Sequence, residues 1–329
     1  MSSTDKNVKI LVTGASGYLG SNILRHLHTA GYQNLTGLSR SLPDADEFDF
    51  RLNHIPVDIL DVLGLEDAFA GHDIVVHAAG LVSYQPADKQ KLFKTNVIGT
   101  ANVVNCALTS GISQLIHISS TAALGIPPEP QVLDEKYMPD PTQFLTDYAL
   151  SKWYGELEVW RGMKEGLHAS VISPSAIIGS STKQKNTDVF IHKIKNGLHK
   201  YPSGSAGFVH HHDVCQAVLL TIQSFSNEKK YILSAENLSW KEFLQAVAFR
   251  LHSSGKLNPA SNLEVKLLVI KNTFKRLIGQ NTGTPTGIAK QMMQVLEYNG
   301  SLITSEFDFT YTPIQQRSEE RRVGKECRL

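Results

Sequence analysis

Short apolar runs alternate with stretches of helical periodicity over the first 175 residues of the chain. The runs are rich in Val, Ile and Leu and bounded by turn residues, which is typical of buried strands. They predict strands over Val8–Thr13, Asn34–Leu38, His54–Val57, Ile74–Ala78, Leu115–Ser119 and Ala169–Ser173. Apolar residues at helical spacing predict a helix after the first strand, and further helices over Leu63–Ala70, Asp88–Thr109 and Asp147–Lys164. Strands that are apolar on both faces and alternate with helices predict an α/β fold with a doubly wound parallel sheet.

The pattern changes after Pro174. Loops rich in Ser, Gly and Lys there alternate with helices predicted over Val189–Gly197, Asp213–Phe225, Trp240–His252 and Pro285–Leu296. We therefore predict that residues 1–175, with a return segment near 207–235, form the main domain. Residues 176–206 and 236–316 are predicted to form a smaller cap that binds substrate at the carboxyl edge of the sheet, where open α/β sheets hold their ligands.

Composition places the chain among ordinary globular proteins. Apolar residues make up 41% and charged residues 19% of the 329 residues, and the formal net charge is +1. This balance gives no reason to expect a nucleic-acid or membrane-surface partner. No apolar run is long enough to span a bilayer, and residues 1–9 lack the apolar core of a signal peptide. Three cysteines without metal-type spacing suit a reducing compartment, so we expect a cytoplasmic protein.

The last residues, 317–329, differ in character from the rest. Arg317–Arg328 reads RSEERRVGKECR, which resembles the in-frame translation of a DNA-sequencing adapter. We predict that this tail is not native, and a charged, solvated native tail is the alternative. No function is assigned to it.

A glycine motif follows the first predicted strand. In Thr13–Gly20, Gly14 permits a tight turn, Gly17 lets the backbone approach a pyrophosphate, and Gly20 allows close packing of helix on strand. The helix that begins there points unsatisfied N–H groups and a positive dipole end toward the phosphates. The motif predicts a dinucleotide site, with Ser16, Tyr18 and Leu19 among the cofactor contacts.

The next strand ends in Ser39-Arg40-Ser41, where a dinucleotide domain usually keeps an acidic residue for the adenosine ribose. A guanidinium beside two hydroxyls suits a 2′-phosphate, so the sequence favours NADP, and NAD stays open. A solvated loop Arg40 is the alternative explanation. Asp58, followed by Ile59, is placed to bind the adenine, whereas Asp61 is expected to cap a helix.

Small residues close the fourth predicted strand. Ala78, Ala79 and Gly80 leave room for a cofactor against the backbone, and they are preceded by His77. We interpret His77 as a packed strand residue and not as an acid–base group.

Tyr148 and Lys152 open a predicted helix and stand one turn apart on the same face. A phenol with a pKa near 10 is a poor proton donor or acceptor at neutral pH. An ammonium one turn away, together with an oxidised nicotinamide, is expected to lower that pKa. The pair predicts proton-transfer chemistry in a nicotinamide-dependent enzyme.

With these motifs together, the chain resembles the extended short-chain dehydrogenase/reductase family, and within it the dihydroflavonol-reductase-like and NAD-dependent epimerase/dehydratase group, which implies a Rossmann fold. The resemblance extends from Val8 to about Ile314. It rests on Thr13–Gly20, His77–Gly80, Thr95–Thr100, Ile118–Thr121, Tyr148–Lys152, Pro174–Gly179, Phe208–Val214 and Phe309–Ile314.

The resemblance implies roles for several further residues. Ser120 becomes the third catalytic residue, holding the substrate oxygen; Ser119 and Thr121 are alternatives, but alternation along a strand turns them away from that face. Asn96 matches a position that helps to order the site, and a helix-packing amide is its alternative. Lys152 also binds the nicotinamide ribose. The nicotinamide end is lined by Pro174, Ser175 and Ile177.

His210-His211-His212 raises the question of a metal. Consecutive residues do not easily converge on one ion, and no carboxylate–cysteine cluster accompanies them, so we predict no metal site. The resemblance places this run before a helix, with Asp213 as its N-cap.

The leading hypothesis is an NADP-dependent reductase or dehydrogenase of a small organic substrate. A nucleotide-sugar epimerase or dehydratase with catalytic NAD is the enzyme alternative, and a non-catalytic dinucleotide-binding sensor is the alternative outside enzymes. The long helices Asp88–Thr109 and Asp147–Lys164 suit a four-helix contact in a homodimer.

Overall fold

The computed structural model describes residues 5–41, 48–179, 200–250, 258–260, 264 and 286–314. The helix predicted over Val189–Gly197 and the adapter-like tail lie outside these residues.

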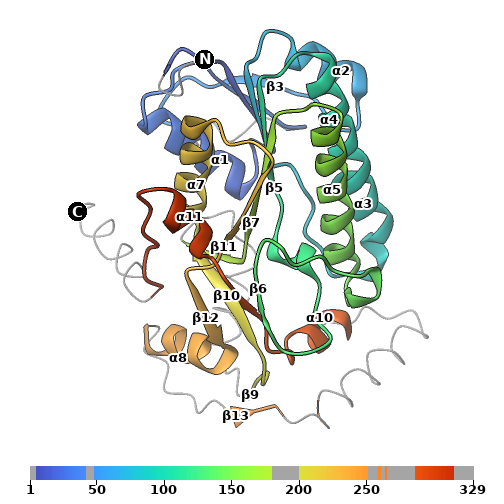
Figure 1. Ribbon diagram of the computed structural model, residues 1–329, viewed down its shortest axis with the longest axis vertical. Coiled ribbons are helices and arrows are strands. Elements are labelled where there is room, and N and C mark those ends of the chain that lie inside the picture. Colours follow the sequence, from blue (N-terminus) through green and yellow to red (C-terminus); the bar gives the residue numbers. More distant parts are fainter. Residues whose placement is uncertain are drawn as a thin grey trace.

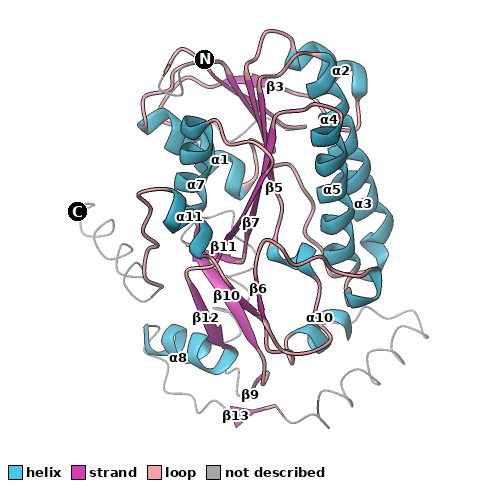
Figure 2. Cartoon of the chain, in the orientation of Figure 1, coloured by secondary structure: helices cyan, strands magenta, loops and turns pink. Residues whose placement is uncertain are grey.

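A seven-stranded parallel sheet forms the centre of the molecule (Figure 2). Its strands are β1 (Ile10–Thr13), β2 (Leu35–Leu38), β3 (Asn53–Ile55), β4 (Ile74–His77), β5 (Gln114–Ile118), β7 (Ala169–Pro174) and β11 (Lys229–Leu233). Across the sheet they lie in the order β11-β7-β5-β4-β1-β2-β3. The prediction of a doubly wound parallel sheet is confirmed.

Helices cover both faces of this sheet (Figure 1). One face carries α1 (Tyr18–Thr29), α7 (His211–Ser224) and α11 (Ser301–Glu306), and the other carries α2 (Val62–Phe69), α3 (Lys89–Phe93), α4 (Gly99–Thr109) and α5 (Asp147–Lys164).

Alternation along β1 explains the two layers. Ile10 and Val12 belong to the apolar cluster under α1 and α7, whereas Leu11 belongs to the cluster under α2, α4 and α5. All three side chains are fully buried. Burying such a side chain stabilises the fold by about 1.5–3 kcal/mol. Helices on both faces of the sheet therefore stabilise β1 by burying its apolar side chains.

The chain reverses its direction of travel across the sheet between β1 and β4. From β1 it proceeds outward to β2 and β3, then returns to β4 and continues through β5 and β7 to β11. In sheets of this kind, ligands bind in the crevice outside the carboxyl ends of the two strands at such a point. A ligand site is therefore expected at the residues after β1 and β4.

The predicted helix Asp88–Thr109 is not continuous. A 3-10 turn at Pro86–Asp88 and α3 are followed by a π-helical segment, Lys94–Ile98, before α4 begins. Apolar periodicity does not detect one wider turn. Asn96 lies in this segment, and its side chain is hydrogen-bonded to Leu81 in the loop after β4. Such π segments occur frequently at functional sites.

Smaller sheets make up the rest of the described chain. A three-stranded sheet joins β8 (Ala176–Ile178), β10 (Ser205–His210) and β12 (Glu236–Ser239), and α8 (Trp240–Arg250) packs on it through Phe208 and Phe243, whose ring centroids lie 4.3 Å apart. Two further strand pairs are β6 (Val132–Leu133) with β14 (Glu297–Tyr298) and β9 (Lys200–Tyr201) with β13 (Asn258–Pro259). These strands were not predicted.

Two predicted boundaries need correction in this part. The helix predicted over Pro285–Leu296 is α10 (Thr286–Gln291), because the chain turns after Gln291 and enters β14. One of the loops predicted after Pro174, over Tyr201–Gly207, is partly strand, since its last residues begin β10. The return segment near 207–235 contains α7 and β11, which add a helix and the edge strand to the main sheet.

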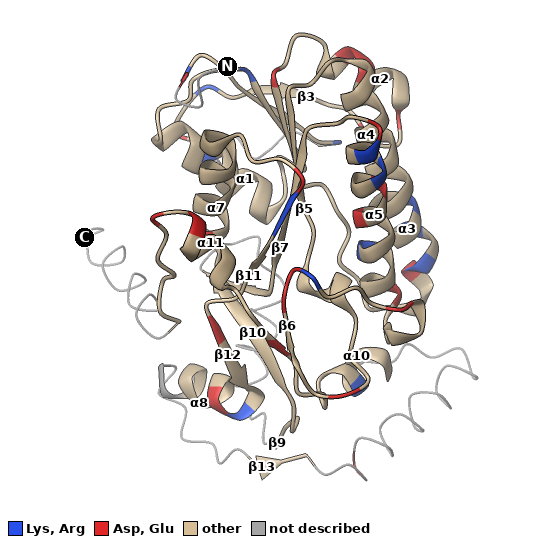
Figure 3. Cartoon of the chain, viewed as in Figure 1, with Lys and Arg blue, Asp and Glu red and all other residues tan. Residues whose placement is uncertain are grey.

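Charged residues lie mainly outside the sheet. Figure 3 shows both signs on the outer helices and few charges on the central strands. Among the described helices, none combines the length and the apolar character needed to cross a bilayer.

Gly155 determines how closely α5 approaches the π segment. A Cβ at this position would overlap the backbone oxygen of Asn96. We expect Gly155→Ala to lower the free energy of unfolding by about 1–3 kcal/mol, because a backbone atom cannot move aside. Urea unfolding measures the change.

The matched control is Gly99→Ala, also in a helix. Its Cβ would meet the terminal methyl of Ile59 at 2.5 Å, and this end of a side chain can move. An equal loss for the two variants would contradict the argument.

Candidate active site

The turn after β1 touches the turn after β4. Gly14 has φ +72°, and a Cβ there would lie 2.8 Å from the backbone N and Cα of Ala79. A Cβ at Gly20 would overlap the Gly14 carbonyl oxygen, so α1 begins directly against the turn. Glycine is required at both positions, which agrees with the tight turn predicted at Gly14 and the close packing predicted at Gly20; the approach of Gly14 to Ala79 was not predicted.

The start of α1 is open to an anion. Its N-cap is Gly17, which has no side chain to offer, and no described side chain caps this end or places a carboxylate in the first turn. The N–H groups there can therefore bind phosphate. Leu19 packs on the cluster beneath α1, while the ring of Tyr18 lies 5.7 Å from that of His211, and burial raises the pKa of the Tyr18 phenol.

His77, the last residue of β4, forms hydrogen bonds with the end of β1 and with α4. Its Nδ1 lies 2.8 Å from Thr13 Oγ1 and its Nε2 lies 3.1 Å from Thr100 Oγ1. Thr100 donates its own proton to the Asn96 carbonyl, so His77 must donate from Nε2 and accept at Nδ1 from Thr13. Burial lowers the pKa of His77 to about 3. The prediction of a packed, neutral strand histidine is confirmed.

Arg40 and Asp58 follow neighbouring strands, β2 and β3. The Arg40 guanidinium is 81% exposed and lies 3.9 Å from the Asp58 carboxylate, which also accepts a hydrogen bond from the Leu60 backbone. The Ile59 side chain is buried in the core, so only its backbone remains for a cofactor. Asp61 accepts a hydrogen bond from Gly64 N at 3.1 Å and caps α2, as predicted.

Tyr148 stands at the start of α5, near Ser120. Thr146 caps the helix by accepting a hydrogen bond from Ala149 N. The Tyr148 phenol forms a hydrogen bond with the Ser120 side chain, and the ring of Tyr84 meets its ring edge-on at 5.6 Å. Burial raises the pKa of the Tyr148 phenol, and the bond with Ser120 opposes this effect.

Lys152 lies one turn further along α5 and is 6% exposed. Its Nζ donates to the Ile118 carbonyl at 2.9 Å. Burial lowers the pKa of Lys152 to about 8, against the opposing effect of the Glu156 carboxylate. The expected lowering of the Tyr148 pKa is not found in the protein alone, because desolvation dominates at the phenol and the ammonium is directed at a backbone carbonyl.

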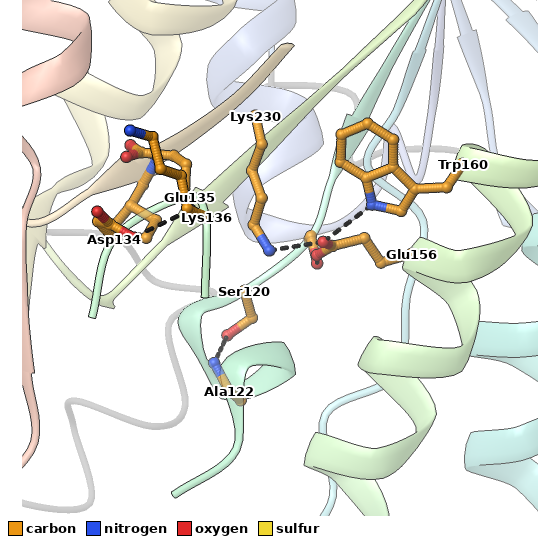
Figure 4. Close-up of polar contacts among 10 residues, drawn as sticks. Ser120, Ala122, Asp134, Glu135, Lys136, Glu156, Trp160 and Lys230 are labelled. Carbon is orange, nitrogen blue, oxygen red and sulfur yellow. Dashed lines mark hydrogen bonds and ion pairs between the residues drawn. The ribbon is translucent and has the colours of Figure 1, made fainter. Parts of the chain in front are cut away.

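Ser120 differs in its contacts from both of its neighbours. It follows β5 and caps the 3-10 turn Thr121–Leu124, where its Oγ accepts a hydrogen bond from Ala122 N at 3.1 Å (Figure 4). Ser119 instead donates to Glu156 Oε2 at 2.7 Å, and Thr121 forms a hydrogen bond with Tyr298. Of these three hydroxyls, the one in contact with Tyr148 belongs to Ser120.

Asn96 connects the loop after β4 to α5. Its Nδ2 donates to the Leu81 carbonyl and to Ser151 Oγ, both at 2.9 Å, and its Oδ1 accepts from Leu81 N at 2.7 Å. The side chain is 2% exposed and its bonding capacity is nearly filled. The hydrogen bonds described for this side chain go to Leu81 and Ser151, and not to Tyr148 or Lys152.

Pro174 and Ile177 lie where the main sheet meets the smaller one. Pro174 ends β7 beside Leu233 of β11, and Ile177 in β8 pairs with Val209 of β10. Gly80 has the Asn96 amide as its neighbour, at 3.5 Å from an added Cβ. These residues share the carboxyl edge with the glycine turn.

The expected N-cap Asp213 is wrong. The cap of α7 is His210, whose Nδ1 accepts a hydrogen bond from His212 N. Asp213 is buried in the first turn, where it accepts hydrogen bonds from Thr312 N at 3.0 Å and Thr312 Oγ1 at 2.7 Å. The helix begins two residues before Asp213, and the Asp213 carboxylate instead binds a segment almost 100 residues later in the chain.

The sequence analysis missed a buried ion pair behind the site. Lys230 of β11 lies 2.6 Å from Glu156 of α5, and Ser119 and Trp160 bind the same carboxylate (Figure 4). The spacing of Tyr148, Lys152 and Glu156 at successive turns was a readable signal for Glu156. Lys230 gave none, because its strand was not predicted.

A family model described as "NAD dependent epimerase/dehydratase family" matches residues 10–234. The chain belongs to this family. Its sequence is 26% identical over 320 residues to a provisionally named dihydroflavonol 4-reductase from Synechocystis, covering 93% of this chain and 91% of that protein. It is 29% identical over 255 residues to cinnamoyl-CoA reductase 1 of Oryza sativa, covering 72% and 74% respectively.

Solved structures share the fold. The crystal structure of gox2253 superposes with a TM-score of 0.82 at 24% identity, covering 94% of this chain and 95% of that one. DesIV, a dTDP-glucose 4,6-dehydratase from Streptomyces venezuelae with NAD bound, superposes with a TM-score of 0.67 at 19% identity, covering 87% and 96%. This member of the epimerase/dehydratase family is an NAD(P)-dependent oxidoreductase of the extended short-chain dehydrogenase/reductase type.

The pKa of Lys152 gives this family member a testable pH dependence. Above a pH of about 8 the buried lysine loses its proton, and with it the positive charge beside Tyr148. We expect kcat/KM for carbonyl reduction to fall as the pH rises through this value, since kcat/KM reports the groups of the free enzyme. Initial rates at subsaturating substrate measure the profile. A plateau extending to the ordinary lysine range, about 10, would exclude such a perturbed lysine.

Proposed function

We propose that the protein is an NADP(H)-dependent reductase, or in the reverse direction a dehydrogenase, of a small organic carbonyl compound. The observation that carries this proposal is the half-buried Tyr148, whose phenol is in hydrogen-bond contact with Ser120, one helical turn from the buried Lys152. Burial raises the pKa of Tyr148 and keeps it protonated at neutral pH. A protonated phenol is the form that can donate to a carbonyl oxygen. The relatives named as reductases support this direction.

The residues at the carboxyl edge fit a nicotinamide dinucleotide. The tight approach of Gly14 to Ala79 and the open start of α1 suit a pyrophosphate. We assign the pyrophosphate to residues 14–20, the adenosine half to Arg40, Asp58 and Ile59, and the backbone near residues 78–80 to the middle of the cofactor. Lys152 is assigned to the nicotinamide ribose, and Pro174 and Ile177 to the nicotinamide end. The bound nicotinamide would supply or accept the hydride.

The protein's own part in the reaction is proton transfer. As the carbonyl oxygen gains negative charge, Tyr148 donates its proton to it, and the electron pair of the broken O–H bond remains on the phenolate. Ser120 Oγ, within reach of the same phenol, donates a hydrogen bond to the substrate oxygen and stabilises its charge. The Lys152 ammonium stabilises the phenolate. Asn96 supports the loop that carries Tyr84, on the side of the Tyr148 ring.

Tyr148→Phe tests this assignment. We expect turnover to fall by about 10²–10⁴-fold, because the proton donor is lost, while cofactor binding changes little. Nicotinamide absorbance with a panel of carbonyls and alcohols measures turnover, and fluorescence titration measures NADPH binding. Tyr84→Phe is the control, since it retains the ring beside Tyr148. Full turnover by Tyr148→Phe would rule out Tyr148 as the donor.

Product analysis in the same assays separates reduction from the enzyme alternative. Product formed in step with loss of NADPH indicates a reductase. Product formed without net change in the cofactor indicates an epimerase or dehydratase, in which the cofactor is reduced and reoxidised within one cycle.

Arg40 supports NADP over NAD in this proposal. Its guanidinium is 81% exposed, and its contact with Asp58 at 3.9 Å is long. Exposed ion pairs of this kind contribute about 0–1 kcal/mol, so the guanidinium can turn to a 2′-phosphate at little cost. Hydrogen bonds from arginine to phosphate are charge-assisted and stronger.

We expect Arg40→Gln to weaken NADPH binding by about 10-fold or more, since a charge-assisted bond contributes about 1.5–3 kcal/mol, and to leave NADH binding nearly unchanged. Titration of both cofactors measures the ratio. Arg51→Gln is the matched control. Arg51 is exposed and precedes β3, so it lies at the end of that strand opposite to the one followed by Asp58. A parallel loss for both cofactors would contradict recognition of the 2′-phosphate.

Two further expectations stay predictions. A homodimer through α4 and α5 is supported by Ile98, which precedes α4 and is 50% exposed. A cytoplasmic location agrees with Cys106 and Cys215, which are both free and buried.

A further inference from the structure

The buried ion pair behind the site joins three parts of the fold. Lys230 Nζ of β11 lies 2.6 Å from Glu156 Oε1 of α5, with side chains 7% and 6% exposed. Ser119, directly after β5, donates to Glu156 Oε2 at 2.7 Å, and Trp160 Nε1 donates to Oε1 at 3.3 Å. Figure 4 shows Lys230 and Trp160 converging on the carboxylate, close to Ser120. The Glu156 carboxylate therefore has partners on α5, on β11 and at the end of β5.

The position of Glu156 relates this pair to the proposed proton transfer. Tyr148, Lys152 and Glu156 are spaced four residues apart on α5 and share one face. Glu156 also holds Ser119, the neighbour of Ser120. One carboxylate thus contacts the backbone segment that carries the hydroxyl and lies one turn beyond the lysine.

Stability alone gives a poor reason for such a pair. Replacing a buried ion pair by well-packed apolar residues is often neutral or stabilising. Lys230 is moreover in the central sheet, where its strand neighbours Tyr231, Ile232 and Leu233 are fully buried. A charged pair kept here is better explained by what it does for its neighbours.

We propose that Glu156 and Lys230 are positioning residues of the proton-transfer site. Glu156 fixes the segment that carries Ser120 and places a carboxylate one helical turn from Lys152, and Lys230 holds that carboxylate in position. This inference rests on the proposed function of Tyr148, Ser120 and Lys152.

The other titratable groups near Lys152 do not replace Glu156. His77 of β4 and His117 of β5 are fully buried beside it, and burial lowers the pKa of both, so they are neutral. Tyr148 on the same helix is protonated because burial raises its pKa. Beyond the pair, Glu135 faces Lys230 and accepts a hydrogen bond from Ile232 N. Among the groups that affect the pKa of Lys152, the anion is Glu156.

The test compares Glu156→Gln, Lys230→Met and the double variant. Glutamine keeps the shape and an acceptor for Ser119 but removes the charge. The matched control is Lys229→Met, one residue earlier on β11, where the lysine binds Glu306 at 2.6 Å and is 45% exposed.

The first readout needs no substrate. The pH dependence of Lys152 acetylation by acetic anhydride, followed by mass spectrometry in the free protein, gives the pKa of this lysine. We expect it to fall by about one unit in Glu156→Gln, because an opposing charge nearby is worth about 1–3 units. Lys230→Met is expected to act in the same direction, since the Glu156 carboxylate loses the partner that holds it in position. Lys229→Met should leave the profile unchanged.

The second readout is the pH profile of kcat/KM, whose basic limb should shift to lower pH together with the pKa of Lys152.

The double variant should regain the thermal stability that is lost in Lys230→Met, because no unpaired charge remains, but it should keep the shifted pH profile. If the pair were purely structural, the double variant would regain both the stability and the pH profile of the unaltered protein. An unshifted acetylation profile in Glu156→Gln would also overturn the proposal. Absence of turnover in the unaltered protein would defeat the proposed function, while acetylation would still test the pair.

Discussion

The site depends on the contact between the backbone turns that follow β1 and β4. Gly14 lies so close to Ala79 that a single added carbon would not fit, and its left-handed backbone favours glycine. Thr13 and His77 connect the same turns by hydrogen bonds, and Thr100 extends the connection to Asn96. The two strand ends at which the chain reverses its order are thereby held at a fixed separation. The open start of α1 lies beside these strand ends, the position at which sheets of this kind bind dinucleotides.

A second constraint comes from α5, which arranges the ionisable groups at successive turns. Its start is fixed by Thr146, and Gly155 lets it lie directly against the Asn96 carbonyl. Burial then acts in opposite directions along the helix, raising the pKa of Tyr148 and lowering that of Lys152. Both shifts favour the neutral forms, so burial alone would give a phenol that donates but a lysine that is only partly charged at neutral to mildly basic pH. A nearby carboxylate is what physical chemistry requires to offset the second shift.

The first half of the molecule could be predicted from sequence because its signals are local. Strands buried on both faces are continuously apolar, and the glycine motif and the helix beginning at Asp147 are readable from spacing alone. The features that escaped prediction depend on distant parts of the chain. The Asp213 carboxylate binds Thr312 while His210 caps α7, and Asn96 in the π segment is hydrogen-bonded to Leu81, 15 residues earlier in the chain. Lys230 reads as a polar surface residue until β11 is paired with β7.

The same division separates the chemistry of the site from its choice of substrate. The groups that we propose move and stabilise the proton come from α5 and the end of β5, and buried hydrogen bonds fix them to the central sheet. The substrate side is approached by Tyr84, from a loop tied to the core mainly through the Asn96–Leu81 bonds, and by the smaller sheet that begins after Pro174. Changes in that loop or sheet can therefore alter which substrate fits while Lys152 and Ser119 keep their buried hydrogen bonds. This separation explains why proton-transfer residues are readable in the sequence while the substrate is not.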